Sequence, residues 1–278
     1  MIRRILVPMD PSEYSKSALL YAANIAQKQQ SEIEGMTVID IPDIEDVVTT
    51  FLPLPQGTEK RIAHENEMIN DARQKSGKLL HEFGTFCDEH RIFCTRRQYE
   101  GKPENVILKE SKFFDLVIIG MRTYFDFETD YKAGHSLEKL LNHTITPIMA
   151  VPKKFRQVKK VLIAYDGSMP AVRAMQRFVH MAVNSEFEIT LLMQAENEEN
   201  AMHEMNNAED YIKRYRDIPI KKVWTRNNLI TVVDKDFISQ SDIVVCGFHS
   251  NNILGKFKLG SFPKYLIERN DTAAFICQ

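Results

Sequence analysis

The feature that most constrains the fold of this 278-residue chain is an internal repeat. Residues 5–12 read ILVPMDPS, and residues 161–168 read VLIAYDGS. Each segment is a short apolar run that ends in Asp-x-Ser and precedes apolar residues at spacings of three and four, which is typical of a helix with one buried face. A repeated unit of this kind predicts two similar domains in tandem.

Further landmarks recur in the same order. Residues 115–120 (DLVIIG) correspond to residues 242–247 (DIVVCG). Each unit then closes on a short helix and a last strand, which reads TPIMAV in the first copy and TAAFIC in the second. The chain is therefore interpreted as a duplication, with a first domain at residues 1–152, a linker at 153–160 and a second domain at 161–278.

Strands alternate with helices inside each unit, and continuous apolar strands indicate parallel sheets that are covered on both faces. In the first unit, the pattern predicts strands near residues 3–9, 33–39, 93–99, 115–120 and 147–151. It predicts helices near residues 13–29, 60–90, 103–112 and 136–143. The long helix is expected to bury one stripe formed by Ile62, Ile69, Ala72, Leu79, Phe83 and Phe86. Residues 49–58, with two prolines and a glycine, are expected to form a loop.

Composition narrows the classes of partner. A net charge of -2 gives no strong attraction to nucleic acid or to an acidic membrane surface. The basic linker, with Lys153, Lys154, Arg156, Lys159 and Lys160, is interpreted as a solvated connection. No apolar run is long enough for a membrane span, the N-terminus lacks the pattern of a signal peptide, and four scattered cysteines form no disulfide framework. A cytoplasmic location is the simplest expectation.

Candidate binding residues follow the predicted strands. Ligands of open parallel sheets bind at the carboxyl ends of the strands. Asp10 and Asp166 end the first strand of each unit, where a carboxylate can either accept hydrogen bonds from a ligand or cap the next helix, and both interpretations stay open. In the second unit, Gly247 ends a strand, and Gly260 with Ser261 opens the last helix, where free N–H groups and a hydroxyl suit a phosphate.

These residues resemble the motif of the universal stress proteins that bind ATP, Gly-x2-Gly-x9-Gly-(Ser/Thr), which accompanies an aspartate after the first strand. Residues 247–261 match the motif with Ser250 at the second glycine. The resemblance extends along the whole chain, twice and in order. For the second unit it implies the following nucleotide-binding residues: Asp166, Gly247, His249, Ser250, Gly260, Ser261 and Phe262.

The first copy of the motif departs further from the family pattern. The resemblance implies the following counterparts there: Asp10, Val38, Gly120, Thr123, Gly134 and Ser136, with Val38 at the position whose backbone contacts the adenine in the family. Thr123 replaces the second glycine, the spacing is one residue longer, and His135 follows Gly134. The loop between them carries Asp126, Glu128 and Asp130, which are expected to repel a triphosphate.

The resemblance implies a tandem universal stress protein of two Rossmann-like α/β domains, packed as an intramolecular pseudo-dimer. It further implies a cytoplasmic sensor or regulator that binds an adenine nucleotide such as ATP, mainly in the second domain. It does not identify the protein partners, and it leaves open whether two chains form a further homodimer. Two alternatives stand beside this: a stress protein that acts only through protein interactions, and a slow hydrolase or metal-assisted enzyme. No catalytic residue is assigned. A zinc site at Cys87, His90 and Cys94 is disfavoured because no fourth ligand is evident.

Overall fold

The computed structural model describes residues 1–52, 55–125, 136–182, 185–248, 251–253, 256–258 and 260–278. The strands of the main sheet are β1 (Arg4–Pro8), β2 (Glu32–Ile39), β3 (Cys94–Glu100), β4 (Leu116–Gly120), β5 (Ile148–Val151), β6 (Lys160–Ala164), β7 (Glu188–Gln194), β8 (Ile220–Thr225), β9 (Ile243–Gly247) and β12 (Ala273–Cys277). The helices are α1 (Glu13–Gln29), α2 (Ile41–Phe51), α3 (Glu59–Glu89), α4 (Pro103–Ser111), α5 (Ser136–His143), α6 (Met169–Met181), α7 (Glu198–Tyr215), α8 (Leu229–Val232) and α9 (Ser261–Arg269).

The smaller elements lie in the second half of the chain. A π-helical turn η1 (Val233–Phe237) and a 3₁₀ turn η2 (Ile238–Gln240) follow α8. Strands β10 (Asn251–Ile253) and β11 (Lys256–Lys258) pair as an antiparallel ribbon apart from the main sheet. None of the helices in the described part of the chain is long and apolar enough to cross a bilayer.

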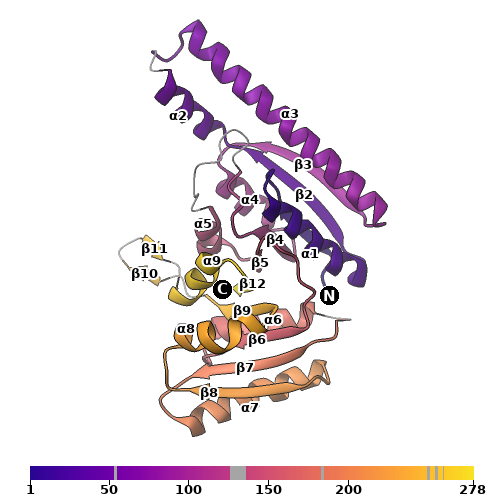
Figure 1. The fold of residues 1–278 in the computed structure, drawn as a ribbon, viewed down its shortest axis with the longest axis vertical. Coiled ribbons are helices and arrows are strands. Elements are labelled where there is room, and N and C mark those ends of the chain that lie inside the picture. Colours follow the sequence, from indigo (N-terminus) through magenta and orange to yellow (C-terminus); the bar gives the residue numbers. More distant parts are fainter. Residues whose placement is uncertain (53–54, 126–135, 183–184, 249–250, 254–255, 259) are drawn as a thin grey trace.

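The main sheet has ten strands among the described residues, in the order β3-β2-β1-β4-β5-β12-β9-β6-β7-β8. Read outward from the centre, both halves follow the same order, and the strands of one half do not interleave with those of the other (Figure 1). All neighbours pair in parallel except β5 and β12, which run antiparallel with Phe275 opposite Met149. The expected α/β class and internal pseudo-dimer are therefore confirmed, with the two last strands forming the join.

Helices cover both faces of the sheet because the strands are apolar on both sides. Side chains alternate along β1, so that Ile5 and Val7 enter one core with α1, α3, α6 and α7. Leu6, between them, enters the other core with α4, α5 and α9. The strand and helix positions expected for the first unit agree with the structure to within one or two residues.

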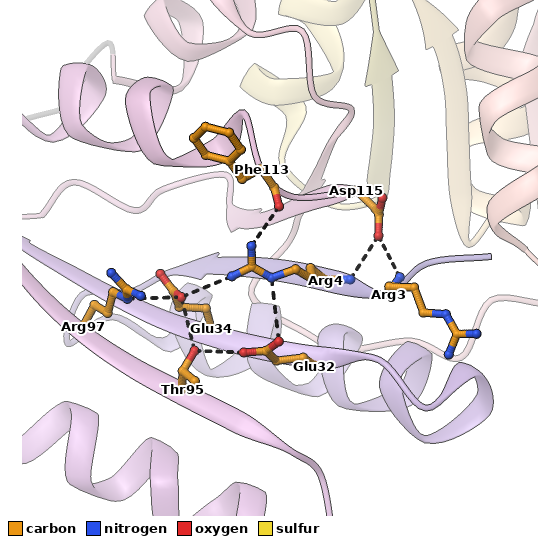
Figure 2. A network of polar contacts seen from close by, with 8 residues as sticks. All are labelled: Arg3, Arg4, Glu32, Glu34, Thr95, Arg97, Phe113 and Asp115. Carbon is orange, nitrogen blue, oxygen red and sulfur yellow. Dashed lines mark hydrogen bonds and ion pairs between the residues drawn. The ribbon is translucent and has the colours of Figure 1, made fainter.

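A paired backbone clamp repeats between the halves and supports the duplication at the level of single atoms. Asp115 Oδ2 accepts hydrogen bonds from the N–H groups of Arg3 (2.7 Å) and Arg4 (3.0 Å), as Figure 2 shows. In the second half, Asp242 Oδ2 accepts from the N–H groups of residues 159 and 160, both at 2.9 Å. Each aspartate precedes the fourth strand of its half and fixes the start of the first strand.

The region after β2 corrects two expectations. The loop expected at residues 49–58 is shorter, because α2 continues to Phe51. Asp40 is the N-cap of this helix, and its carboxylate accepts from Asp43 N (3.1 Å). The helix buries Ile44 and Val48 against α3. Ile62 was expected in the buried stripe of the long helix but is 45% exposed, because the start of α3 extends past the sheet with only α2 beside it (Figure 1).

Candidate functional site

Asp10, at the carboxyl end of β1, is enclosed by its own chain. Its side chain is only 3% exposed. Oδ1 accepts from the N–H and hydroxyl of Ser12 and from the hydroxyl of Ser15, and Oδ2 accepts from Tyr124 N at 2.8 Å. Ser12, rather than Asp10, is the N-cap of α1. The carboxylate therefore holds together the segments that follow β1 and β4.

Asp166, at the matching position after β6, is exposed. Its Oδ1 accepts from Ser168 N at 2.9 Å, and no described residue donates to its Oδ2. Ser168 is the N-cap of α6, so Asp166 is not needed as a cap. The two aspartates therefore share a position in the repeat, but only Asp166 offers an accessible carboxylate oxygen.

Gly247 and Gly120 each sit where a helix start meets the end of a strand. A Cβ on Gly247 would lie 2.3 Å from Ala171 N in α6, and one on Gly120 would lie 2.4 Å from Tyr14 Cβ in α1. Both positions therefore need glycine so that the chain's own helices can pack against the strand ends, and the nucleotide contact expected of these two glycines stays a prediction. The contact also places the end of β9 beside the turn that carries Asp166.

The charge of Asp166 reaches the buried strand end. Burial raises the pKa of the Cys246 thiol to about 12, and the neighbouring negative charge of Asp166 adds to that shift. Burial also raises the pKa of the Tyr165 phenol, with the charges of Glu204 and Asp166 adding to it. The carboxyl ends of β6 and β9 thus form one acidic corner.

The remaining residues expected in the first site are covered. Val38 is fully buried on β2, and Thr123 is 3% exposed with no partner for its hydroxyl among the described residues. Phe125 is also buried and takes a left-handed backbone with φ of 59°, which is uncommon for an aromatic residue. The segment after β4 therefore closes over the carboxyl end of β1.

The N-terminus of α9 is open in a way that suits an anion. Gly260 is the N-cap and supplies no side chain, and no described group accepts from the N–H groups of Ser261 or Phe262. Ser261 is exposed, whereas the Phe262 ring packs partly against the core. Gly260 has φ of -58° and ψ of 151°, an extended backbone that any residue can adopt. The first turn of α9 can therefore donate to a bound oxyanion.

Several residues named from the sequence lie outside the described residues: Gly134, His249, Ser250 and, in the acidic loop, Asp126, Glu128, Asp130 and His135. Ser136 is the first residue of α5, and its side chain is not described. Among the described residues, no group of three side chains could hold a metal ion. At the candidate zinc position near Cys87 and Cys94, His90 Nδ1 forms a hydrogen bond with the carbonyl oxygen of Phe86 (2.8 Å).

Two residues of the second site escaped the sequence interpretation. Gln194 is the register counterpart of Val38, because Tyr165 N donates to Leu192 O (2.9 Å) as Met9 N donates to Met36 O (2.7 Å). It is exposed, and its Oε1 accepts from Leu229 N at 2.8 Å. A signal was present, since Gln194 follows Asp166 by 28 residues, the same spacing that separates Asp10 and Val38.

Glu204 is the second missed residue. Its Oε2 would lie 3.5 Å from a Cβ on Gly167, the residue next to Asp166. It comes from α7, and nothing in the sequence distinguishes it from the other acidic residues of that helix. The second site thus has two carboxylates at one turn.

Comparison with known proteins gives a consistent result. The model of the universal stress protein family matches residues 1–152. A universal stress protein of Synechocystis is 24% identical over 191 residues, which cover 63% of this chain and 64% of that protein. The match thus spans less than two thirds of the relative's length.

Among solved structures, a universal stress protein from Archaeoglobus fulgidus superposes with a TM-score of 0.70 at 18% identity and covers 99% of this chain and 98% of its own. A structure of Pseudomonas aeruginosa that is named a putative universal stress protein superposes with a TM-score of 0.62 at 14% identity. The match covers 99% of this chain and 93% of that one. At these identities, the likeness concerns the fold.

Proposed function

Because this chain belongs to the universal stress protein family, we propose that it is a cytoplasmic sensor or regulator that binds one adenine nucleotide, of the ATP type, in its second half. The proposal keeps the division into a domain at residues 1–152, a linker at 153–160 and a domain at 161–278. It rests on the resemblance of residues 247–261 to the family's nucleotide motif and on the contrast between the two halves.

The contrast between Asp10 and Asp166 is the observation that carries the proposal. A ligand that hydrogen-bonds to this carboxylate needs an oxygen that the protein has not already used. Asp10 is buried and bonded through both oxygens to its own chain. Asp166 is exposed and bonded through one oxygen to Ser168. The first half is thereby closed by its own segment after β4, and the second half remains able to bind.

The polarity of the second site fits the two ends of a nucleotide. Asp166 and Glu204 are acceptors, which suit the hydroxyl groups of a ribose or the amine of a base. The free N–H groups at the start of α9 suit phosphate oxygens. Gln194 adds an exposed amide at the position that corresponds to the adenine-contacting residue of the family. An anionic phosphate near Asp166 would be repelled, so the charges favour one orientation of the ligand.

Equilibrium binding of labelled ATP, AMP and a non-hydrolysable ATP analogue tests the proposal. The expected result is saturable binding of ATP, which Asp166→Asn weakens at least tenfold through loss of a charge-assisted hydrogen bond. Asp217→Asn, an exposed acid after α7, is the matched control and should bind as the parent does. Failure of all three nucleotides to bind would favour the interaction-protein alternative instead. Turnover of ATP in the same assay would favour the hydrolase alternative.

A further inference from the structure

A cavity of about 70 Å³ lies where the two halves meet, on the face of the sheet opposite α9. Its walls come from α1 and α6, its floor from Met149 of β5 and Phe275 of β12, and its roof from residues 155–158 of the linker. By volume it has room for about five or six water-sized positions, which corresponds to a small organic molecule rather than a nucleotide. It shares no lining residue with the site around Asp166.

The walls of this interface cavity are unusually aromatic. Rings from both halves line it: Tyr21, Phe155, Phe178, Phe187 and Phe275. Tyr21 and Phe155 meet edge to face at 4.8 Å between centroids, and Phe178 meets Phe187 at 5.7 Å and Phe275 at 5.5 Å in the same manner. Aromatic pairs prefer this edge-to-face arrangement, and such walls can make the same kind of contact with the ring of a ligand. They favour a flat aromatic ligand over a branched aliphatic one.

One face of α1 brings polar groups into these apolar walls. Tyr21, Asn24 and Lys28 are spaced by three and four residues, so they line the same side of the helix, and all three border the cavity. The buried Tyr21 hydroxyl accepts from Arg156 N at 3.1 Å and keeps its own hydrogen for a ligand. Asn24 is half-buried, and no described residue bonds to its amide.

The charged side chains among the described lining residues of the cavity are basic. Lys28 and Arg156 both border it, and no acidic side chain is among its lining residues. Burial raises the pKa of the Tyr21 phenol, and the charge of Asp242 adds to that shift, so the hydroxyl is a hydrogen-bond donor at neutral pH, as an ordinary phenol also is. A ligand with a carboxylate directed toward α1 would thus meet the Tyr21 hydroxyl and the Asn24 amide, with the positive charge of Arg156 beside them, while its ring would meet the phenylalanines.

We propose that the cavity between α1 and α6 binds a small aromatic carboxylate of about the size of benzoate, as a second ligand site independent of the nucleotide. Residues of both halves and of the linker line it, so such a ligand would stabilise the packing of the two halves.

Titration of the full chain with benzoate, followed by ligand-observed NMR and calorimetry, tests this proposal. We expect saturable binding, with the neutral analogue benzamide and the non-aromatic cyclohexanecarboxylate each at least fivefold weaker. Ala182→Leu, which places extra bulk in the cavity wall, should lower the affinity for benzoate at least tenfold. Asn24→Asp, a nearly isosteric change that places a negative charge beside the carboxylate, should do the same.

The controls separate this site from the nucleotide site. Asp166→Asn should leave benzoate binding unchanged, and Asn24→Asp should leave ATP binding unchanged. Melting curves of both cavity variants show whether they are folded, and the benzamide comparison needs no variant at all. The highest benzoate concentration in the test is 10 mM, about a hundredfold above a dissociation constant of 0.1 mM. The proposal would be overturned by absence of benzoate binding at that concentration, by equal binding of benzamide, or by full binding of benzoate to a folded Ala182→Leu variant.

Discussion

Replacing Gly260 by Asp separates phosphate binding from stability at the start of α9. The backbone there, with φ of -58° and ψ of 151°, is open to any residue, and among the described residues a Cβ would meet only Pro263 Cδ at 3.7 Å, an ordinary contact. Asp is among the best N-caps and exceeds Gly there by a few tenths of a kcal/mol. The variant should therefore melt at the same temperature as the parent or slightly higher.

Nucleotide binding should respond in the opposite direction. The new carboxylate would occupy the N–H groups that face the phosphates and would repel the phosphate charge. Loss of one or two charge-assisted hydrogen bonds costs about 1.5–3 kcal/mol each, so the affinity for ATP should fall at least tenfold. Calorimetric titration measures it, with Gly77→Asp on an open, exposed surface of α3 as the charge-matched control. A folded Gly260→Asp variant that binds ATP as the parent does would refute the phosphate role of α9.

Three further results are expected. Gly247→Ala should lower the free energy of unfolding by roughly 1–3 kcal/mol or more, because the new Cβ would collide with α6. Unfolding in urea measures this change, and unchanged stability would contradict the packing between β9 and α6. Of the four cysteines, only the half-buried Cys94 should react quickly with a disulfide reagent at pH 8, because burial raises the pKa of the other three thiols. Rapid reaction of a second thiol per chain would contradict this prediction. The pKa of the Tyr265 phenol is raised to about 12 from its ordinary 10.0, so the folded state favours the neutral phenol. The stability that this phenol contributes is therefore present below pH 10 and is lost as the pH rises toward 12. Tyr265→Phe should flatten that decline in unfolding curves, and an equally steep decline in the variant would count against this explanation.

The fold was largely predictable because its evidence is periodic. Apolar runs, helical spacings and repeated landmarks located the strands and helices of the first unit, and the repeat implied two similar sheets. Helix α2 was missed because it is short, carries Pro42 in its first turn and leads directly into the two prolines of the expected loop, although Asp40 is an N-cap signal. The exposure of Ile62 depends on how far α3 extends past the sheet, which only tertiary structure determines.

The site was less predictable because accessibility is a property of packing. Asp10 and Asp166 occupy equivalent places in the sequence, and only the structure shows that Tyr124 N and two serines saturate the first carboxylate. The glycines that end β4 and β9 were expected to contact a ligand, and only the structure shows that the packing of α1 and α6 also requires glycine there. Glu204 reaches the second site from a distant helix, and local sequence carries no record of that approach.

A structure of the full chain soaked or crystallised with ATP would show which half binds the nucleotide. We expect one nucleotide per chain, with its ribose or base near Asp166 and its phosphates at the N–H groups of Ser261 and Phe262, and with Asp10 still bonded to Tyr124 N. A triphosphate bound beside Asp10, with the second half empty, would contradict the assignment.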